Sequence, residues 1–149
     1  MARAGPDRRR FRRAADRTRE AVRHLRFLLD THVALRWGLD PASLADRART
    51  AIADGGNEVF LSSASVWETA IKIEAGRLEI PESIESMARE ANLTELPITW
   101  SHASRAAALP PLHHDPFDRM LVAQAIEEAL VLITRDALVR RYDVATMPA

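Results

Sequence analysis

Short apolar runs with strand character alternate with helical segments along most of this chain. The runs that we predict as strands cover residues 27–29, 59–61, 94–98, 131–134 and 144–147. Periodic apolar positions and capping residues predict helices over residues 33–39, 44–53, 63–75, 82–91, 100–109 and 118–130. Pro97 favours an edge position for the third strand. Strands that alternate with helices pair in parallel, so we expect an α/β fold in which helices cover a parallel sheet of four to five strands.

The composition describes a single ordinary globular domain. The chain has 149 residues, of which 47% are hydrophobic and 28% are charged. It has no cysteine, which excludes disulfides and cysteine-ligated zinc and fits a reducing cytoplasm. Charged residues interrupt every apolar run before it reaches the length of a membrane span, so we expect no membrane segment and a cytoplasmic protein.

The net charge of zero hides two oppositely charged regions. Residues 1–26 contain ten arginines against three acidic residues, a net charge of +7, whereas residues 27–149 contain 11 basic and 18 acidic residues, a net charge of −7. Residues 1–24 have few large apolar side chains and form a basic extension to a domain that covers residues 25–149. Three interpretations stay open for this extension: an RNA-binding arm, a solvated helical or disordered segment, or, as we prefer, an artefact of a misplaced start site.

Four acidic residues follow or flank the predicted strands. Asp30 comes directly after the first strand, and Glu68 lies on the helix after the second. Asp118 opens the helix before the fourth strand, and Asp136 follows that strand. The carboxyl ends of parallel strands share one edge of the sheet, where ligands bind in open α/β folds. Carboxylates gathered there repel one another unless a cation lies between them, and oxygen ligands suit Mg²⁺ or Mn²⁺. We therefore predict a metal centre for phosphodiester hydrolysis.

Each of these acids also has a structural interpretation. Asp30 and Asp136 are positioned to cap the helices that follow them, and Glu68 is spaced to pair with Lys72 on a helix surface. Asp115, three residues before Asp118, is either an auxiliary acid or a cap. On the helix that carries Glu68 we expect the apolar side chains to form the buried side, namely Val66, Trp67, Ala70, Ile71 and Ile73.

Other catalytic chemistries fit the sequence less well. His113 and His114 invite a zinc site, but adjacent side chains point in different directions, and neither an HExxH pattern nor a cysteine accompanies them. The chain has no cysteine nucleophile, no GxSxG motif and no glycine-rich phosphate loop. Arg119 and Arg135 neighbour two of the acids and are candidates for ion pairs or phosphate contacts.

Four segments carry a family resemblance over residues 25 to about 145. They are FLLDTHVALRW, SSASVWETAIKIEAGRLEIP, LPPLHHDPFDRMLVAQA and LITRD. In order and spacing they resemble the PIN-domain ribonucleases, and in particular the VapC toxins of bacterial type II toxin–antitoxin pairs. The resemblance implies a three-layer α/β/α sandwich and a Mg²⁺- or Mn²⁺-dependent endoribonuclease. The basic extension and the His113–His114 pair depart from the family pattern.

The resemblance assigns the acidic positions one by one. Asp30, Glu68, Asp118 and Asp136 match the catalytic, metal-holding acids of the family, and Asp115 matches a further acid that is frequent in this branch. Such carboxylates hold one or two cations that activate a water for in-line attack on the phosphodiester, without a side-chain nucleophile. The resemblance further implies an RNA substrate, a homodimer, and a cognate antitoxin whose C-terminal segment brings a basic side chain to the acidic pocket.

Three functions are compatible with such a domain. We predict a toxin ribonuclease. The alternatives are a PIN nuclease with a housekeeping role in RNA maturation or decay, and a non-catalytic RNA-binding or regulatory module of the same fold. The presence of all four acids argues against the last, because a module that has lost its chemistry is expected to lose at least one of them.

Overall fold

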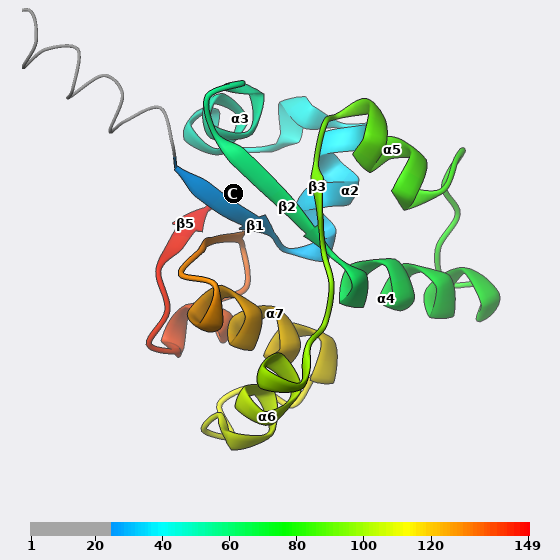
Figure 1. Ribbon diagram of the computed structural model, residues 1–149. Helices are drawn as coiled ribbons and strands as arrows, with labels where there is room; N and C mark the ends of the chain where they lie inside the picture. The colour runs from blue at the N-terminus through cyan, green and yellow to red at the C-terminus, as the bar shows by residue number, and fades with distance from the viewer. Residues whose placement is uncertain (1–24) are drawn as a thin grey trace, which may run out of the picture.

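Residues 25–149 of the computed structural model alternate strands and helices as the sequence predicts (Figure 1). The strands are β1 (Arg26–Leu29), β2 (Glu58–Ser62), β3 (Thr94–Leu96), β4 (Val131–Thr134) and β5 (Thr146–Pro148). The α-helices are α2 (Thr31–Leu39), α3 (Asp46–Ala53), α4 (Ser63–Glu74), α5 (Ile84–Glu90), α6 (Trp100–Ala108) and α7 (Pro116–Glu127). Two short 3-10 helices are η1 (Pro41–Ser43) and η2 (Val139–Arg141). The basic extension predicted over residues 1–24 lies outside the described residues.

Within the described residues the strands form one parallel sheet in the order β3–β2–β1–β4–β5. Phe27 in the central strand β1 lies opposite Val59 of β2 on one side and Val131 of β4 on the other. Strand β3 is at an edge, as Pro97 predicts. The chain runs from β1 outward to β2 and β3 and then crosses back to β4. The strand order therefore reverses between β1 and β4, where open α/β sheets leave a crevice at the carboxyl ends of the strands.

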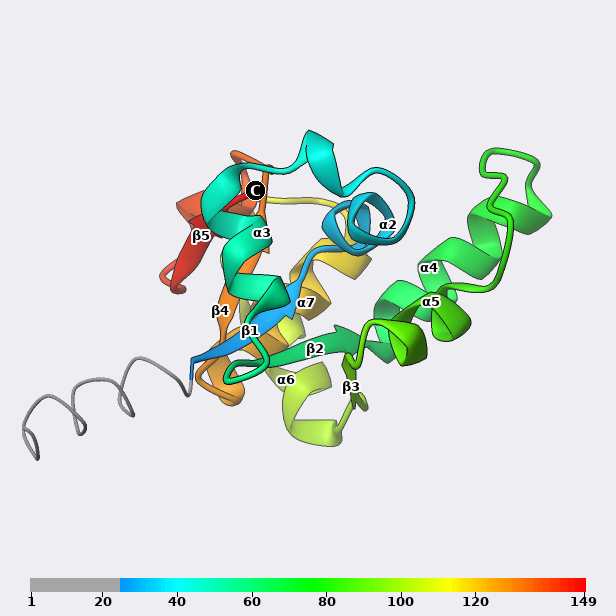
Figure 2. The same cartoon turned by 90° about the horizontal axis from the view of Figure 1, so that it is seen from above.

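Helices cover both faces of the sheet, which confirms the three-layer arrangement (Figures 1 and 2). Successive strand residues point to opposite faces, so Phe27 and Leu29 pack with residues of α2, α3 and α5, whereas Leu28 packs with residues of α7 and η2. These three side chains are almost fully buried, as expected for a central parallel strand with helices on both sides. No helix within residues 25–149 has both the length and the apolar character needed to cross a membrane.

The predicted helix over residues 118–130 is displaced toward the N-terminus. Helix α7 begins at Pro116, with Asp115 as its N-cap, and ends at Glu127. Ala129 then adopts a φ of 52°, in the left-handed region that usually follows a helix end and usually holds glycine. Because no glycine marks this position, the sequence pattern placed the end of the helix too late.

Helix α4 reverses the burial that its sequence predicts. Trp67, Ile71 and Ile73 are 64%, 39% and 44% exposed, so the prediction that they lie on the buried side is wrong. Instead, Ser65 and Glu68 are buried, on the side of α4 that meets α2 and α7. The physical reason is that α4 leaves the carboxyl end of β2 and extends beyond the sheet, so that much of its length has no sheet to pack on (Figure 2).

Candidate metal centre

Asp30 lies at the carboxyl end of β1, where the strand order reverses, and is 5% exposed. Its Oδ1 accepts the backbone N–H of His32 at 3.0 Å, which confirms that it caps α2. Its Oδ2 accepts the hydroxyl of Thr134 at 2.8 Å, and Thr134 Oγ1 in turn accepts the backbone N–H of Asp136 at 3.0 Å. The end of β4 therefore holds the Asp30 carboxylate in place and links it to the segment that carries Asp136.

Glu68 is a buried carboxylate on α4, with only 4% of its surface exposed. Its Oε2 accepts a hydrogen bond from Lys72 Nζ at 2.8 Å, so the predicted pair forms, although Glu68 is not on the surface. Its Oε1 is buried and has no hydrogen-bond partner within residues 25–149. One turn earlier, Ser65 Oγ accepts the buried hydroxyl of Thr31 at 2.8 Å, which joins α4 to the start of α2. A buried carboxylate oxygen without a partner is costly, and a cation beside Oε1 would remove that cost.

Asp115 and Asp118 open α7. Asp115 Oδ1 accepts the backbone N–H groups of Phe117 at 2.8 Å and of Asp118 at 3.2 Å, which confirms its interpretation as a cap. A metal-ligand role for Asp115 stays a prediction. Asp118 lies in the first turn of the helix, where the aligned N–H dipoles favour an anion, and 17% of its side chain is exposed.

The pKa of Asp118 reports how closely the acids are grouped. Burial raises this pKa most, and the negative charges of Asp30, Asp115 and Glu68 raise it further, to about 7, despite an opposing effect of His113. An isolated aspartate titrates near a pKa of about 4. The fold therefore gathers more negative charge around Asp118 than it neutralises by itself, which is the electrostatic condition of a cation site.

Asp136 joins this group through His113. Nε2 of His113 lies 2.8 Å from Oδ2 of Asp136 and 3.1 Å from Oδ2 of Asp118. Nδ1 of His113 accepts the backbone N–H of Asp115 at 3.0 Å, so the proton of the neutral ring belongs on Nε2, between the two carboxylates. Asp136 Oδ1 also accepts the backbone N–H of Leu138 at 2.8 Å, so its predicted capping role is confirmed.

This contact shifts the pKa values of both partners. Burial lowers the pKa of His113, but the hydrogen bond to Asp136 and the charges of Asp118, Asp136 and Asp115 outweigh it, so the pKa is raised. Burial raises the pKa of Asp136, but hydrogen bonds from His113 and from the backbone N–H groups of Leu138 and Val139 outweigh it, so this pKa is lowered. Asp136 is therefore ionised at neutral pH.

His113 is the site residue that the sequence interpretation missed. The sequence singled out His113 and His114 only as a poor zinc site, and nothing in the pattern shows that the imidazole of His113 turns back toward Asp118 and Asp136. His113, Asp118 and Asp136 each have one nitrogen or oxygen atom that could bind a metal, and these three atoms lie within 4.8 Å of one another. As long as Nδ1 accepts a backbone N–H, however, Nε2 keeps its proton and has no lone pair for a metal. The donor set that remains is carboxylate oxygen, which fits a hard divalent cation.

A cavity of about 310 Å³ opens onto this centre. The residues that line it are Asp30, His32, Val33, Arg36, Asp118, Arg135 and Asp136. Arg36 thus stands beside the acids and can contact an anionic ligand, whereas the guanidinium of Arg135 donates to the carbonyl oxygens of Ala149 and Ser43. Arg119 does not belong to this set. Its guanidinium donates to the carbonyl oxygens of Ala106 and Leu109, so that it ties α7 to α6 rather than pairing with an acid.

Comparison with known families and proteins decides the family. The family model of the PIN domain matches residues 27–145, a span that contains all four acids. The chain belongs to the PIN domain family. A similar protein, Ribonuclease VapC22 of Mycobacterium tuberculosis, is 33% identical over 77% of this chain and 90% of that protein.

Solved structures share the fold of this PIN domain. VapBC2 from Rickettsia felis, bound to a DNA fragment of its promoter, aligns with a TM-score of 0.63 at 14% identity, over 84% of this chain and 99% of that chain. FitAcB from Neisseria gonorrhoeae has a TM-score of 0.51 at 18% identity, over 81% and 96% of the two chains. VapBC-5 from Mycobacterium tuberculosis has a TM-score of 0.52 at 18% identity, over 83% and 96%. At these identities the likeness establishes the fold alone.

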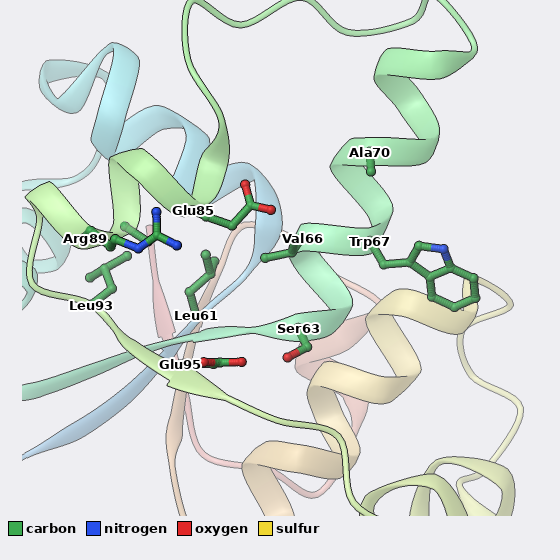
Figure 3. Close-up of a pocket in the computed structure, with 10 residues that line it drawn as sticks. Leu61, Ser63, Val66, Trp67, Ala70, Glu85, Arg89, Leu93 and Glu95 are labelled. Atoms are coloured by element: carbon green, nitrogen blue, oxygen red, sulfur yellow. The ribbon is translucent and has the colours of Figure 1, made fainter.

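A larger cavity of about 610 Å³ lies elsewhere in this PIN domain, between α4, α5 and β3. Figure 3 shows Leu61 and Val66 lining it and Glu85 and Arg89 on the α5 side, and Trp67 borders it with its ring directed toward α7. None of the four acids lines this cavity. Cavity size alone would favour it as the functional site. Three of the acids, Asp30, Asp118 and Asp136, line the smaller cavity instead, and the pKa of Asp118 is raised there, so the smaller cavity is the candidate site.

Proposed function

We propose that this PIN domain is a metal-dependent endoribonuclease and acts as the toxin of a toxin–antitoxin pair. The observation that carries the proposal is that Asp30, Asp118 and Asp136 line one cavity. Burial and neighbouring negative charges, that of Glu68 included, raise the pKa of Asp118 there. The 33% identity to a protein named as a ribonuclease supports RNA as the substrate. In this proposal Asp30, Glu68, Asp118 and Asp136 hold Mg²⁺ or Mn²⁺, with Asp115 as a less direct contributor.

A divalent cation held there supplies a water of lowered pKa and stabilises the charge that develops on the leaving oxygen. The chain itself does the positioning. Thr134 fixes the Asp30 carboxylate through the 2.8 Å hydrogen bond to Oδ2. Asp115 holds the first turn of α7 and with it Asp118. Arg36, on the wall of the acidic cavity, would contact phosphate oxygens of the RNA.

The same proposal names the partners and the compartment. An antitoxin protein would inhibit the enzyme by placing a basic side chain in the acidic cavity, where excess negative charge favours it. A homodimer would provide a longer surface for RNA than one acidic monomer offers. We place the protein in the cytoplasm, because the proposed substrate, cellular RNA, is there.

Cleavage of total cellular RNA by the purified full chain tests the enzymatic part. We expect discrete fragments with Mg²⁺, and none after addition of EDTA or in the Asp30→Asn variant. Asp46→Asn is the matched control, since Asp46 is an exposed aspartate of α3 whose partner is Arg49. Cleavage that persists in Asp30→Asn, or that disappears equally in Asp46→Asn, contradicts the assignment.

Growth of a bacterial host tests the toxin part. Induction of the wild-type chain should arrest growth, and induction of Asp30→Asn should not. Coexpression of the protein encoded directly upstream should restore growth and copurify with both variants. Normal growth, despite RNA cleavage by the purified protein, would favour the housekeeping nuclease instead.

A further inference from the structure

Trp67 is an exposed aromatic residue in a fixed orientation. Its side chain is on α4, and 64% of the residue is exposed. Its ring meets Phe117 at a centroid distance of 5.3 Å and an interplanar angle of 75°, an edge-to-face contact. An edge-to-face contact fixes the orientation of the two rings and can leave one face of the exposed ring open to a further partner. Trp67 is therefore preorganised, although most of it is not buried.

Both members of this aromatic pair are next to proposed metal ligands. Trp67 directly precedes Glu68 on α4, and Phe117 directly precedes Asp118 on α7. The contact between the rings thus joins the two helices beside the acidic centre, as Figure 3 shows for Trp67 turned toward α7. The Trp67 ring is on the exposed side of α4 and the Glu68 carboxylate on the buried side, so the two side chains extend from the same turn of the helix in different directions.

Because the domain is acidic, contacts with RNA that need no positive charge can contribute to its affinity for RNA. Residues 27–149 carry a net charge of −7, so phosphate contacts over most of the domain surface are unfavourable. Stacking of a nucleobase on an aromatic ring needs no positive charge and suits single-stranded nucleic acid of any sequence. Space for a base is present, because Trp67 borders an open hollow of about 470 Å³ formed with Ala70, Ile71, Glu74 and Ala75.

We propose that Trp67 is a stacking platform for a nucleobase of single-stranded RNA, adjacent to the phosphate that is cleaved. This inference rests on the proposed ribonuclease function. Arg36, which lines the acidic cavity, contacts the phosphate, and Trp67 on the exposed side of α4 holds a base. The RNA is thereby fixed at two points around the metal-holding carboxylates. A protein partner over the outer side of α4 would instead cover Trp67 together with Ile71 and Ile73.

Equilibrium binding without cleavage tests this proposal. The full chain is titrated in EDTA with a single-stranded RNA of about 12 nucleotides, a length that such sites can span, and with the same oligomer in which abasic sites replace all bases. We expect Trp67→Ala to weaken binding of the intact RNA by about 5- to 150-fold, the range for loss of one stacked base. The same variant should bind the abasic oligomer as the wild type does. Trp67→Phe should retain most of the affinity for intact RNA.

Two control variants separate stacking from general loss of surface. Trp100→Ala removes a tryptophan that is 94% exposed and starts α6, and Ile73→Ala removes an exposed apolar side chain of α4 that does not border the hollow. Both should bind intact RNA as the wild type does. Thermal unfolding of Trp67→Ala and Trp67→Phe shows whether each variant is folded.

Several results would overturn the proposal. The first is unchanged binding of intact RNA by Trp67→Ala, and the second is an equal loss of affinity for intact and abasic RNA. The third is a wild-type chain that binds both oligomers equally well, and the fourth is a loss in Ile73→Ala as large as that in Trp67→Ala. A shift of Trp67→Ala from dimer to monomer with RNA binding intact would assign the residue to a protein interface. The ribonuclease assignment is tested by the separate cleavage assay, where it fails if cleavage persists in EDTA or in Asp30→Asn. The binding assay needs neither metal nor catalysis, so its outcome does not depend on that result.

Discussion

Helices α4 and α7 lie next to each other and bury opposite kinds of side chain. Helix α7 buries the apolar residues Leu121, Val122, Ala123 and Ala125, together with Gln124. Helix α4 buries Ala64, Ser65, Glu68 and Thr69 and leaves Trp67, Ile71 and Ile73 exposed. The first pattern is that of a helix which holds a domain together. The second is that of a helix whose inner side supplies a site and whose outer side is free to meet something else.

The difference shows that burial has two purposes in this fold. The apolar side chains of α7 contribute through transfer from water and close packing. The buried carboxylate of Glu68 opposes folding in the absence of a cation, because one of its oxygens has no partner within residues 25–149. Lys72 pairs with the other oxygen of Glu68, and in the proposed function a bound cation would remove the remaining cost. Substitutions on the two helices should have different consequences.

The largest effect on stability is expected from the inner side of α7. Leu121 is 1% exposed, and Leu121→Ala should lower the free energy of unfolding by about 2–5 kcal/mol, from lost transfer energy and the cavity left behind. Urea unfolding of the two proteins measures this. A loss below about 1 kcal/mol would mean that α7 is not the stabilising half of the comparison.

A different result is expected at the buried carboxylate of α4. Glu68→Gln should reduce RNA cleavage by more than about 100-fold, the upper range for loss of a residue that merely supports a metal ligand. In metal-free protein the free energy of unfolding should change little, because loss of the partly exposed Lys72 pair is offset by weaker repulsion of Asp118.

A metal-binding measurement distinguishes the loss of a metal ligand in Glu68→Gln from a general loss of folded structure. Mn²⁺ at about 100 times its dissociation constant should stabilise the wild-type protein by about 2.7 kcal/mol. The stabilisation should be far smaller in Glu68→Gln, as measured by thermal unfolding with and without Mn²⁺. An undiminished response of Glu68→Gln to Mn²⁺ would remove Glu68 from the metal centre.

An intermediate effect is expected where β4 supports the site. Thr134→Val preserves volume but removes the hydroxyl that donates to Asp30 Oδ2 and accepts the N–H of Asp136. We expect about 10- to 100-fold weaker Mn²⁺ binding, measured by calorimetry, because the Asp30 carboxylate loses its fixed orientation. Thr50→Val on α3 is the matched control. Equal Mn²⁺ affinities in wild type and Thr134→Val would show that the hydrogen bond does not position Asp30.

The smallest effect is expected on the outer side of α4. Ile71 is 39% exposed, so Ile71→Ala should change the free energy of unfolding by only about 0.5 kcal/mol. Urea unfolding beside Leu121→Ala gives the comparison directly. A loss as large as that of Leu121→Ala would show that the outer side of α4 is covered in solution, for example by a second copy of the chain.

The sequence predicted the sheet and most of its helices, because strand runs such as residues 131–134 and caps such as Ser62 are local signals. It failed where the decisive interaction is not local. The end of α7 depends on Ala129, which adopts a left-handed conformation without glycine. The burial of α4 depends on where the helix leaves the sheet, and its apolar residues by themselves indicate the wrong side.

The candidate site, like the fold, has features that the sequence predicts and features that only the structure shows. The sequence by itself determined which acids meet, because the carboxyl ends of β1 and β4 must share one edge of a parallel sheet, and Asp30 and Asp136 follow them. Only the tertiary structure decided that His113 places its Nε2 proton between Asp118 and Asp136, and that Glu68 keeps one buried oxygen without a partner. The positions of the strands follow from local patterns of few residues, whereas strand order, side-chain direction and burial follow from the packing of elements far apart in the chain.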